Sequence, residues 1–288
     1  GACLSMPRVM ITDVYSKTEA AGKLSLLLAT MAIFPVLSVS LGGVSGEKFG
    51  WQFNFLVMFL LGFFIFVGNI FYAPETIQSK VDQLSLKRIL VGVKSLFTNR
   101  TFLYLTLISS VQAAAFFSMA GFMPYQFKRL GASPSEFGMW FALTSLGYIS
   151  GNIVSSRVSK KIKLEKISLI GCYWSFIAIC SMSFCLLDSL SFPITLAIAC
   201  FMYGVGNGLV ISNVVVLSIS SVEKENSGLA NGIMGAMQMT SGGLLGSLII
   251  FIGGDESFFR AILCLLALSF LAIVCCISVY LKGSDRFK

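Results

Sequence analysis

The sequence predicts an all-α protein that crosses a membrane many times. Of its 288 residues, 56% are hydrophobic and only 12% are charged, whereas an ordinary soluble domain carries about 25% charged residues. The mean hydropathy is +0.86. The apolar residues gather in stretches of roughly 20, which is the helix length that spans a bilayer. Because a spanning segment must satisfy its own backbone hydrogen bonds, these stretches are predicted to be helices.

Eight stretches are long enough to span the hydrocarbon layer. They lie near 23–46, 51–73, 101–124, 135–156, 167–187, 192–214, 228–252 and 258–281. Residues 1–13 are also apolar but are too short to span. The chain opens at Gly1 within what resembles a helix already under way, so we expect the natural N-terminus to lie upstream.

Basic residues are shared unequally between the two sets of connecting loops. When the ends of alternate helices are assigned to one face, that face collects sixteen of the 21 Lys and Arg residues; the other has four, and Arg8 is the remaining one. The positive-inside rule makes the basic face cytoplasmic. We therefore predict a cytoplasmic C-terminus, and we attribute the net charge of +8 to membrane topology rather than to nucleic-acid binding.

One connection, residues 74–100, is longer than the others. Its apolar residues recur at roughly helical spacing, which predicts an amphipathic helix on the membrane surface; they are Val81, Leu84, Ile89, Val93 and Leu96. This linker separates residues 1–73, with about two and a half helices, from residues 101–288, with six. Six helices after a cytoplasmic linker suggest a twelve-helix transporter made of two halves.

Several motifs follow one another along the chain. "FPVLSVSLGG" from Phe34 precedes "GWQFNF" and "APET", and these are followed by "FMPYQFKRLGASPSEFGMWFALTSLGYISGN", "MYGVGNGLVISNVVVLSI" and "SGLANGIMGAMQMTSGGLLGSLI". Their order and spacing resemble the Bcr/CflA-type multidrug efflux group of the major facilitator superfamily, and "RVMITD" from Arg8 resembles the exit of its fourth helix. The chain departs from that pattern at Val39, where a second proline is common, and at Gln52, where the group has Arg. The loop "GNIVSSRVSKK" lacks the Asp of the superfamily's Gly-x-x-x-Asp-Arg loop.

The resemblance implies a major facilitator fold that runs from helix four to helix twelve and lacks about the first three and a half of twelve helices. It also implies a monomeric secondary transporter in the plasma (inner) membrane of a bacterium. Such a protein would export hydrophobic drug-like compounds by alternating access, with protons as the coupling ion. An exporter of a small metabolite, an inactive fragment, and a non-transporting receptor or scaffold are the alternatives.

The helix that begins the first motif carries residues that weaken helices: Pro35, Gly42, Gly43 and Gly46. Glycines four residues apart let membrane helices approach closely, and the spacing recurs at 147/151, 228/232 and 242/246. Static packing explains any single pair equally well. The resemblance places this antiporter-motif helix at the interface between the two halves.

Polar side chains inside the spans are costly and are therefore candidates for a function. Interhelical hydrogen bonding is the simpler explanation for each of them, whereas the resemblance implies a substrate cavity with an adaptable apolar and aromatic wall. The cavity candidates are Gln112, Phe116, Phe117, Trp140, Tyr148, Asn152, Asn207, Asn213, Asn231, Met234 and Gln238.

Groups able to carry a proton or hold a metal are scarce. The chain has no histidine, and its thirteen carboxylates lie at helix ends or in loops, so we expect the coupling acid upstream of residue 1. Proton-driven efflux by these 288 residues alone would contradict that expectation. Arg8 and Asp13 form either a gating pair or a snorkelling arginine beside a helix-end acid. The eight cysteines fall in apolar runs without a C-x-x-C pair, so we predict no metal site, no cofactor and no enzyme activity.

Overall fold

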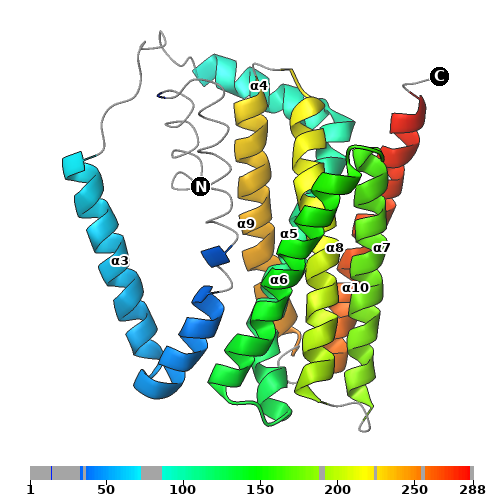
Figure 1. The fold of residues 1–288 in the computed structure, drawn as a ribbon. Coiled ribbons are helices and arrows are strands. Elements are labelled where there is room, and N and C mark those ends of the chain that lie inside the picture. Colours follow the sequence, from blue (N-terminus) through cyan, green and yellow to red (C-terminus); the bar gives the residue numbers. More distant parts are fainter. Residues whose placement is uncertain are drawn as a thin grey trace. The chain divides into compact units, whose positions relative to one another are not determined.

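The computed structural model describes residues 14, 33–34, 37–72, 86–187, 192–223, 226–253 and 257–285, and these form helices and the turns between them (Figure 1). A helical segment at 37–49 is followed by α3 (Trp51–Tyr72), α4 (Leu86–Thr98), α5 (Arg100–Arg129), α6 (Pro134–Val158), α7 (Leu164–Met182), the 3-10 turn η1 (Ser183–Leu186), α8 (Pro193–Ser220), α9 (Ser227–Phe251) and α10 (Phe258–Asp285). The chain divides into two compact units. The first contains residues 1–84 and 133–142, and the second contains residues 85–132 and 143–288.

Among the described residues, six helices are long and apolar enough to cross a membrane: α3, α5, α7 with η1, α8, α9 and α10. The predicted all-α membrane-spanning class is thus confirmed. Of the other two predicted spans, half of 23–46 lies outside the described residues, and 135–156 corresponds to the 25-residue helix α6. Its most apolar stretch falls short of those in the six because glycine and serine recur along the helix and Asn152 interrupts it.

Helix α5 is longer than predicted. It continues to Arg129, five residues past the predicted end at 124, because Pro124 lies inside the helix rather than at its end. Proline removes one backbone donor, but membrane helices tolerate this where neighbouring groups compensate. Gly131, which has a φ of +81°, follows the helix in the left-handed conformation.

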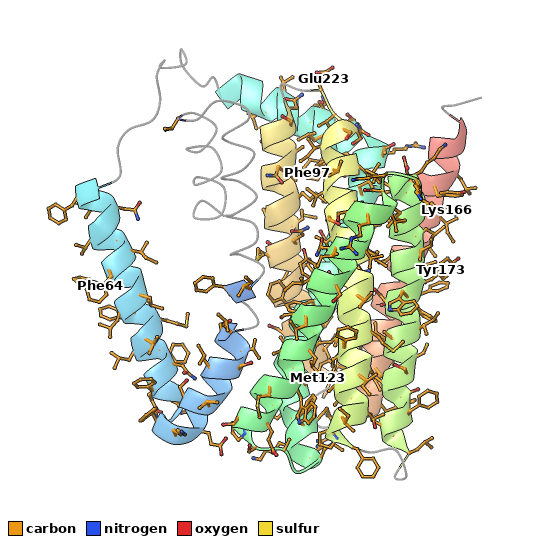
Figure 2. The ribbon with its side chains drawn as sticks, in the orientation of Figure 1. Phe64, Phe97, Met123, Lys166, Tyr173 and Glu223 are labelled. Carbon is orange, nitrogen blue, oxygen red and sulfur yellow. The ribbon has the colours of Figure 1, made fainter. Side chains whose placement is uncertain are left out.

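The described part of the first unit contains a helical hairpin formed by segment 37–49 and α3. Gly50 makes the turn with a φ of +83°, a conformation that glycine adopts without steric cost. The Asn54 side-chain amide donates to the carbonyl of Gly42 at 3.1 Å, and the Ser45 hydroxyl donates to Asn54 Oδ1. The apolar window of α3 has no buried residue, and the side chain of Phe64, labelled in Figure 2, is 67% exposed.

The second unit is a bundle in which α5 packs against α8, α9 and α10, while α7 packs against α8 and α10. These helices run side by side, and α4 lies across one end of them (Figure 1). All five bundle helices contribute to one buried apolar cluster that includes Ile108, Cys172, Val210, Met234 and Ala272. A smaller cluster of Leu96, Phe102 and Ala230 fixes α4 to α5 and α9.

The two ends of the second unit differ in charge. The end that carries α4 and the α6–α7 turn gathers the larger basic set, to which Lys166 belongs (Figure 2); its described members are Lys94, Arg100, Arg157, Lys160, Lys161, Lys163 and Lys166. The described basic residues at the opposite helix ends are Lys128, Arg129 and Arg260. Which end is cytoplasmic, and whether α4 lies on a membrane surface, remain predictions from the positive-inside rule and from amphipathicity.

Candidate transport site

Four polar side chains form a closed cluster inside the second unit. The Tyr203 hydroxyl on α8 donates to the backbone carbonyl of Gln112 on α5 at 3.0 Å. The Asn207 amide donates to the same carbonyl at 3.4 Å and to the Tyr203 oxygen at 3.2 Å. The Gln112 side-chain amide in turn donates to the Ser175 hydroxyl on α7 at 3.5 Å.

The cluster forms because α8 places Tyr203 and Asn207 one turn apart on the same face, where both meet the middle of α5. Gln112 is 1% exposed, Tyr203 is fully buried and Asn207 is 6% exposed. Buried amides and hydroxyls need partners, because desolvating them without a hydrogen bond is costly. The cluster therefore ties α5, α7 and α8 together, and these side chains are not open to a ligand.

Asn213 on α8 also forms a hydrogen bond to a neighbouring helix. Its side-chain amide donates to the Ser155 hydroxyl on α6 at 2.8 Å and to the carbonyl of Leu209 one turn earlier at 2.7 Å. Asn152 behaves differently, since it is half-buried and donates back to the carbonyl of Tyr148 on its own helix at 2.8 Å. Asn213 therefore fixes α8 to α6, whereas Asn152 and the half-buried Tyr148 remain partly accessible.

The predicted glycine pair on α6 lies in a close helix crossing. A Cβ added at Gly147 would collide with the backbone carbonyl of Phe201 on α8, and one added at Gly151 would collide with that of Val205. Backbone atoms cannot rotate away as a flexible side chain can. This pair therefore confirms the close approach that its spacing predicted.

The partner glycines on α8 were not among the predicted pairs. A Cβ at Gly204 would collide with the carbonyl of Thr144, and one at Gly208 with the carbonyl of Tyr148. Their four-residue spacing was visible in "MYGVGNGLVISN". It could have been found by the same rule that found the pair on α6.

Gly206, between those two glycines, faces the other side of α8. A Cβ there would lie 2.7 Å from the backbone nitrogen of Ser175 and 2.9 Å from the carbonyl of Gly171, both on α7. Helix α8 is therefore held between α6 and α7, with glycine at the closest points on both sides.

The two predicted glycine pairs on α9 differ in how closely neighbouring atoms approach them. Gly242 lies under the ring of Phe117, whose Cδ2 would be 2.5 Å from an added Cβ. Gly246 makes only ordinary contact with α5, at 3.8 Å. At Gly228 and Gly232 no described atom lies within 4 Å of an added Cβ, so within the described part of the chain this pair has no close-packing role.

The remaining candidates lie on more accessible surfaces. Phe117 is 39% exposed, and Phe116, Asn231 and Gln238 are half-buried, whereas Met234 is 1% exposed and belongs to the core. Helices α5 and α9 run in the same direction, and the Ser241 hydroxyl joins them by donating to the carbonyl of Ser110 at 2.9 Å. Phe117, Asn231 and Gln238, which we call the α5–α9 strip, give this helix pair an accessible surface of mixed polarity.

In the first unit, segment 37–49 crosses the first turns of α6. A Cβ at Gly43 would lie 2.5 Å from the carbonyl of Pro134 and 3.2 Å from the Cα of Gly138. At Gly42 no described atom lies within 4 Å, and at Gly46 the neighbour is the side chain of Asn54 at 3.3 Å. Of the predicted glycines on this helix, Gly43 is therefore the one at which the crossing is tight.

Trp140 is half-buried on the part of α6 that belongs to the first unit. Pro35, Arg8 and Asp13 lie outside the described residues. Within the described segments, acidic side chains are absent from the buried set, and no group of three or more His, Cys, Asp or Glu could hold a metal ion.

Comparison with known proteins gives the family. The model of the Major Facilitator Superfamily matches residues 1–247 and, in a second alignment, residues 105–287. The uncharacterized MFS-type transporter YdgK of Bacillus subtilis is 23% identical over 254 residues, which cover 86% of this chain and 62% of YdgK. A bicyclomycin resistance protein homolog of Haemophilus influenzae is 24% identical over 251 residues, which cover 83% of this chain and 60% of that protein. The chain thus spans about 60% of the length of these relatives.

A solved structure shows the same fold. The crystal structure of a bacterial homolog to the human lysosomal transporter Spinster, in an inward-facing and unoccupied conformation, aligns with a TM-score of 0.62 and 14% identity. The alignment covers 96% of this chain and 73% of that one. With a family match over most of its length and six membrane-length helices, the chain belongs to the major facilitator superfamily, a family of membrane transporters rather than enzymes.

Proposed function

We propose that the protein takes part in the export of hydrophobic drug-like compounds across the bacterial inner membrane by alternating access. The observation that carries this proposal is the similarity, over 83% of the chain, to a protein named a bicyclomycin resistance protein homolog. The accessible α5–α9 strip supports it, because aromatic and amide side chains together suit hydrophobic compounds that carry a few polar groups.

In this proposal the polar candidates have two different roles. The α5–α9 strip, with Phe116, contacts the substrate. Gln112, Asn207 and Asn213 stabilise the bundle, since they are 1%, 6% and 5% exposed and bonded to neighbouring helices. A bundle that is tied internally in this way moves as one body, as rocking-type alternating access requires.

We further propose that protons are the coupling ion and that the C-terminus is cytoplasmic. The described acidic residues lie at helix ends or in turns; they are Glu47, Glu136, Glu165, Glu223 and Asp285. A mid-membrane proton carrier is therefore expected outside the described residues.

The test is dye efflux in bacteria that lack their own efflux pumps. Cells that express the full-length protein and are loaded with ethidium, a hydrophobic cation, should lose fluorescence faster than vector cells, and a protonophore should abolish the difference. Equal efflux from both kinds of cell would contradict the export of such compounds. A parallel screen should show that hydrophobic dyes, and not amino acids, raise the melting temperature of the purified protein, because a ligand that binds the folded state stabilises it.

A further inference from the structure

A carboxylate from segment 37–49 contacts the first turn of α6. Glu47 Oε2 accepts a hydrogen bond from the backbone N–H of Ser135 at 2.9 Å, although the two residues are 88 positions apart in sequence. Ser135 is the second residue of α6, which begins at Pro134. The first N–H groups of a helix have no partner within the helix, so Glu47 supplies one from a different segment.

The helix also caps itself at this end. The Ser133 hydroxyl accepts from the N–H of Glu136 at 3.3 Å, and Glu136 Oε2 accepts from the N–H of Ser133 at 2.8 Å. This reciprocal pair is a capping box. Because the box leaves the N–H of Ser135 without a partner inside the helix, the Glu47 bond adds to the capping of α6 rather than replacing it.

The electrostatics favour a charged Glu47. The hydrogen bonds from Ser135 are the main cause that lowers its pKa below the usual value, and the neighbouring Lys48 lowers it further. The positive end of the α6 dipole also stabilises an anion at this position. On the facing helix the titratable group is Glu136, whose carboxylate is used by the capping box.

Segment 37–49 and α6 also pack tightly against each other at Gly43 and Gly138. Gly43 and Gly138 approach backbone to backbone, and the Ser40 hydroxyl lies 3.5 Å from the carbonyl of Gly138. Segment 37–49 therefore meets α6 in two ways, through close glycine packing and, one turn later, through a charged hydrogen bond.

We propose that the Glu47–Ser135 contact is a latch that holds the end of segment 37–49 against α6 and opens in each transport cycle. This inference rests on the proposed function, because alternating access requires helices from the two sides of the linker to separate, and Glu47 precedes the linker while Ser135 follows it. At neutral pH the carboxylate is charged, so the latch is closed by charge and is released by movement of the helices rather than by a proton.

Loss of the Glu47 charge should shift the equilibrium between the closed and the released Glu47–Ser135 contact toward the released state by roughly two- to fivefold. This is the usual range for an exposed anion at a helix N-terminus. Hydrogen–deuterium exchange measures this shift without any substrate. In Glu47→Gln, exchange should increase both in peptides from 37–49 and in peptides from 133–138. The isosteric change keeps the side-chain volume, so folding is preserved.

Glu136→Gln is the matched control, since it removes a carboxylate from the same helix end without touching Glu47. It should increase exchange in 133–138 and leave 37–49 at the wild-type rate. The latch is disproved if Glu47→Gln leaves both segments at wild-type rates, or if it changes only 133–138 as the control does. If both segments exchange faster but cells export no ethidium, the latch stands and the proposed substrate class fails.

Discussion

The hydroxyl of Tyr203 donates to the backbone carbonyl of Gln112 at 3.0 Å, across the contact between α8 and α5. Asn207 donates to both of these oxygens. Because Tyr203 is fully buried, water cannot replace a partner that is removed. The three residues thus form one hydrogen-bonded unit at the centre of the bundle.

Tyr203→Phe should lower the free energy of unfolding by about 1 kcal/mol, because it deletes a buried donor and leaves the Asn207 amide with one acceptor fewer. Thermal unfolding in detergent measures the loss. Tyr173→Phe, at a 45% exposed position on α7 (Figure 2), should have no measurable effect. Equal melting temperatures for Tyr203→Phe and wild type would show that the cluster does not stabilise the bundle.

Gly204→Ala should destabilise the protein by about 1–3 kcal/mol, the usual cost of forcing an extra carbon into a packed contact. The added methyl group meets the backbone carbonyl of Thr144, which cannot turn away. Gly232→Ala is the matched control, because the described surroundings leave room for a Cβ there. If Gly204→Ala and Gly232→Ala have the same melting temperature, the crossing of α6 and α8 is looser than the structure shows.

The membrane-spanning class could be predicted from the sequence because it follows from one physical quantity, the length of apolar stretches relative to the bilayer. Helix ends were less certain. The apolar stretch predicts a span near 101–124, whereas α5 continues to Arg129 with Pro124 inside it, since the cost of an interior proline depends on neighbours that the sequence does not name.

The roles of the polar candidates could not be predicted, because periodicity does not say which face of a helix is covered. Asn207 and Asn231 both interrupt apolar helices, yet Asn207 is 6% exposed while Asn231 is half-buried. Ser175 and Tyr203, which complete the cluster around Gln112, belong to no motif that would single them out in the sequence. Their role becomes visible only from the distances to Gln112.

Gly43→Leu should abolish transport while the protein still inserts into the membrane, because no side chain fits between segment 37–49 and the carbonyl of Pro134. The sequence does not distinguish Gly42 from Gly43, but at Gly42 the described surroundings leave space for a Cβ. We therefore expect Gly42→Leu to retain activity. Dye efflux normalised to the amount of protein in the membrane measures both variants, and equal loss in the two would contradict the distinction.

Acid should release the Glu47 contact only at low pH. The pKa of this carboxyl lies below its usual value, mainly because Ser135 hydrogen bonds favour the charged form, so the contact stabilises the structure above that pKa and is lost as the pH falls through it. Hydrogen exchange of residues 133–138, corrected for the intrinsic pH dependence, should show a transition below about pH 4.3, the ordinary glutamate value. Glu47→Gln should lack this transition. A midpoint above pH 4.3 would mean that the charged form is not favoured.

Substitutions of Phe117 and Phe122 on α5 should affect different properties, dye efflux for Phe117 and stability for Phe122. Phe122 is fully buried and Phe117 is 39% exposed. Phe122→Ala should lower the free energy of unfolding by about 3 kcal/mol or more, because it leaves a cavity in the core. Phe117→Ala opens space above Gly242 on an accessible surface, and we expect it to change dye efflux more than stability.

Phe270→Ala supplies the control for Phe117→Ala, because Phe270 is a 60% exposed phenylalanine on α10. Efflux of ethidium and of a second, larger dye should be measured for each variant at matched expression. A Phe117 that contacts the substrate changes the ratio of the two rates, because trimming a binding surface affects ligands of different size unequally, whereas loss of folded protein lowers both rates by the same factor. If Phe117→Ala and Phe270→Ala give the same ratio as wild type, the α5–α9 strip is not the substrate surface.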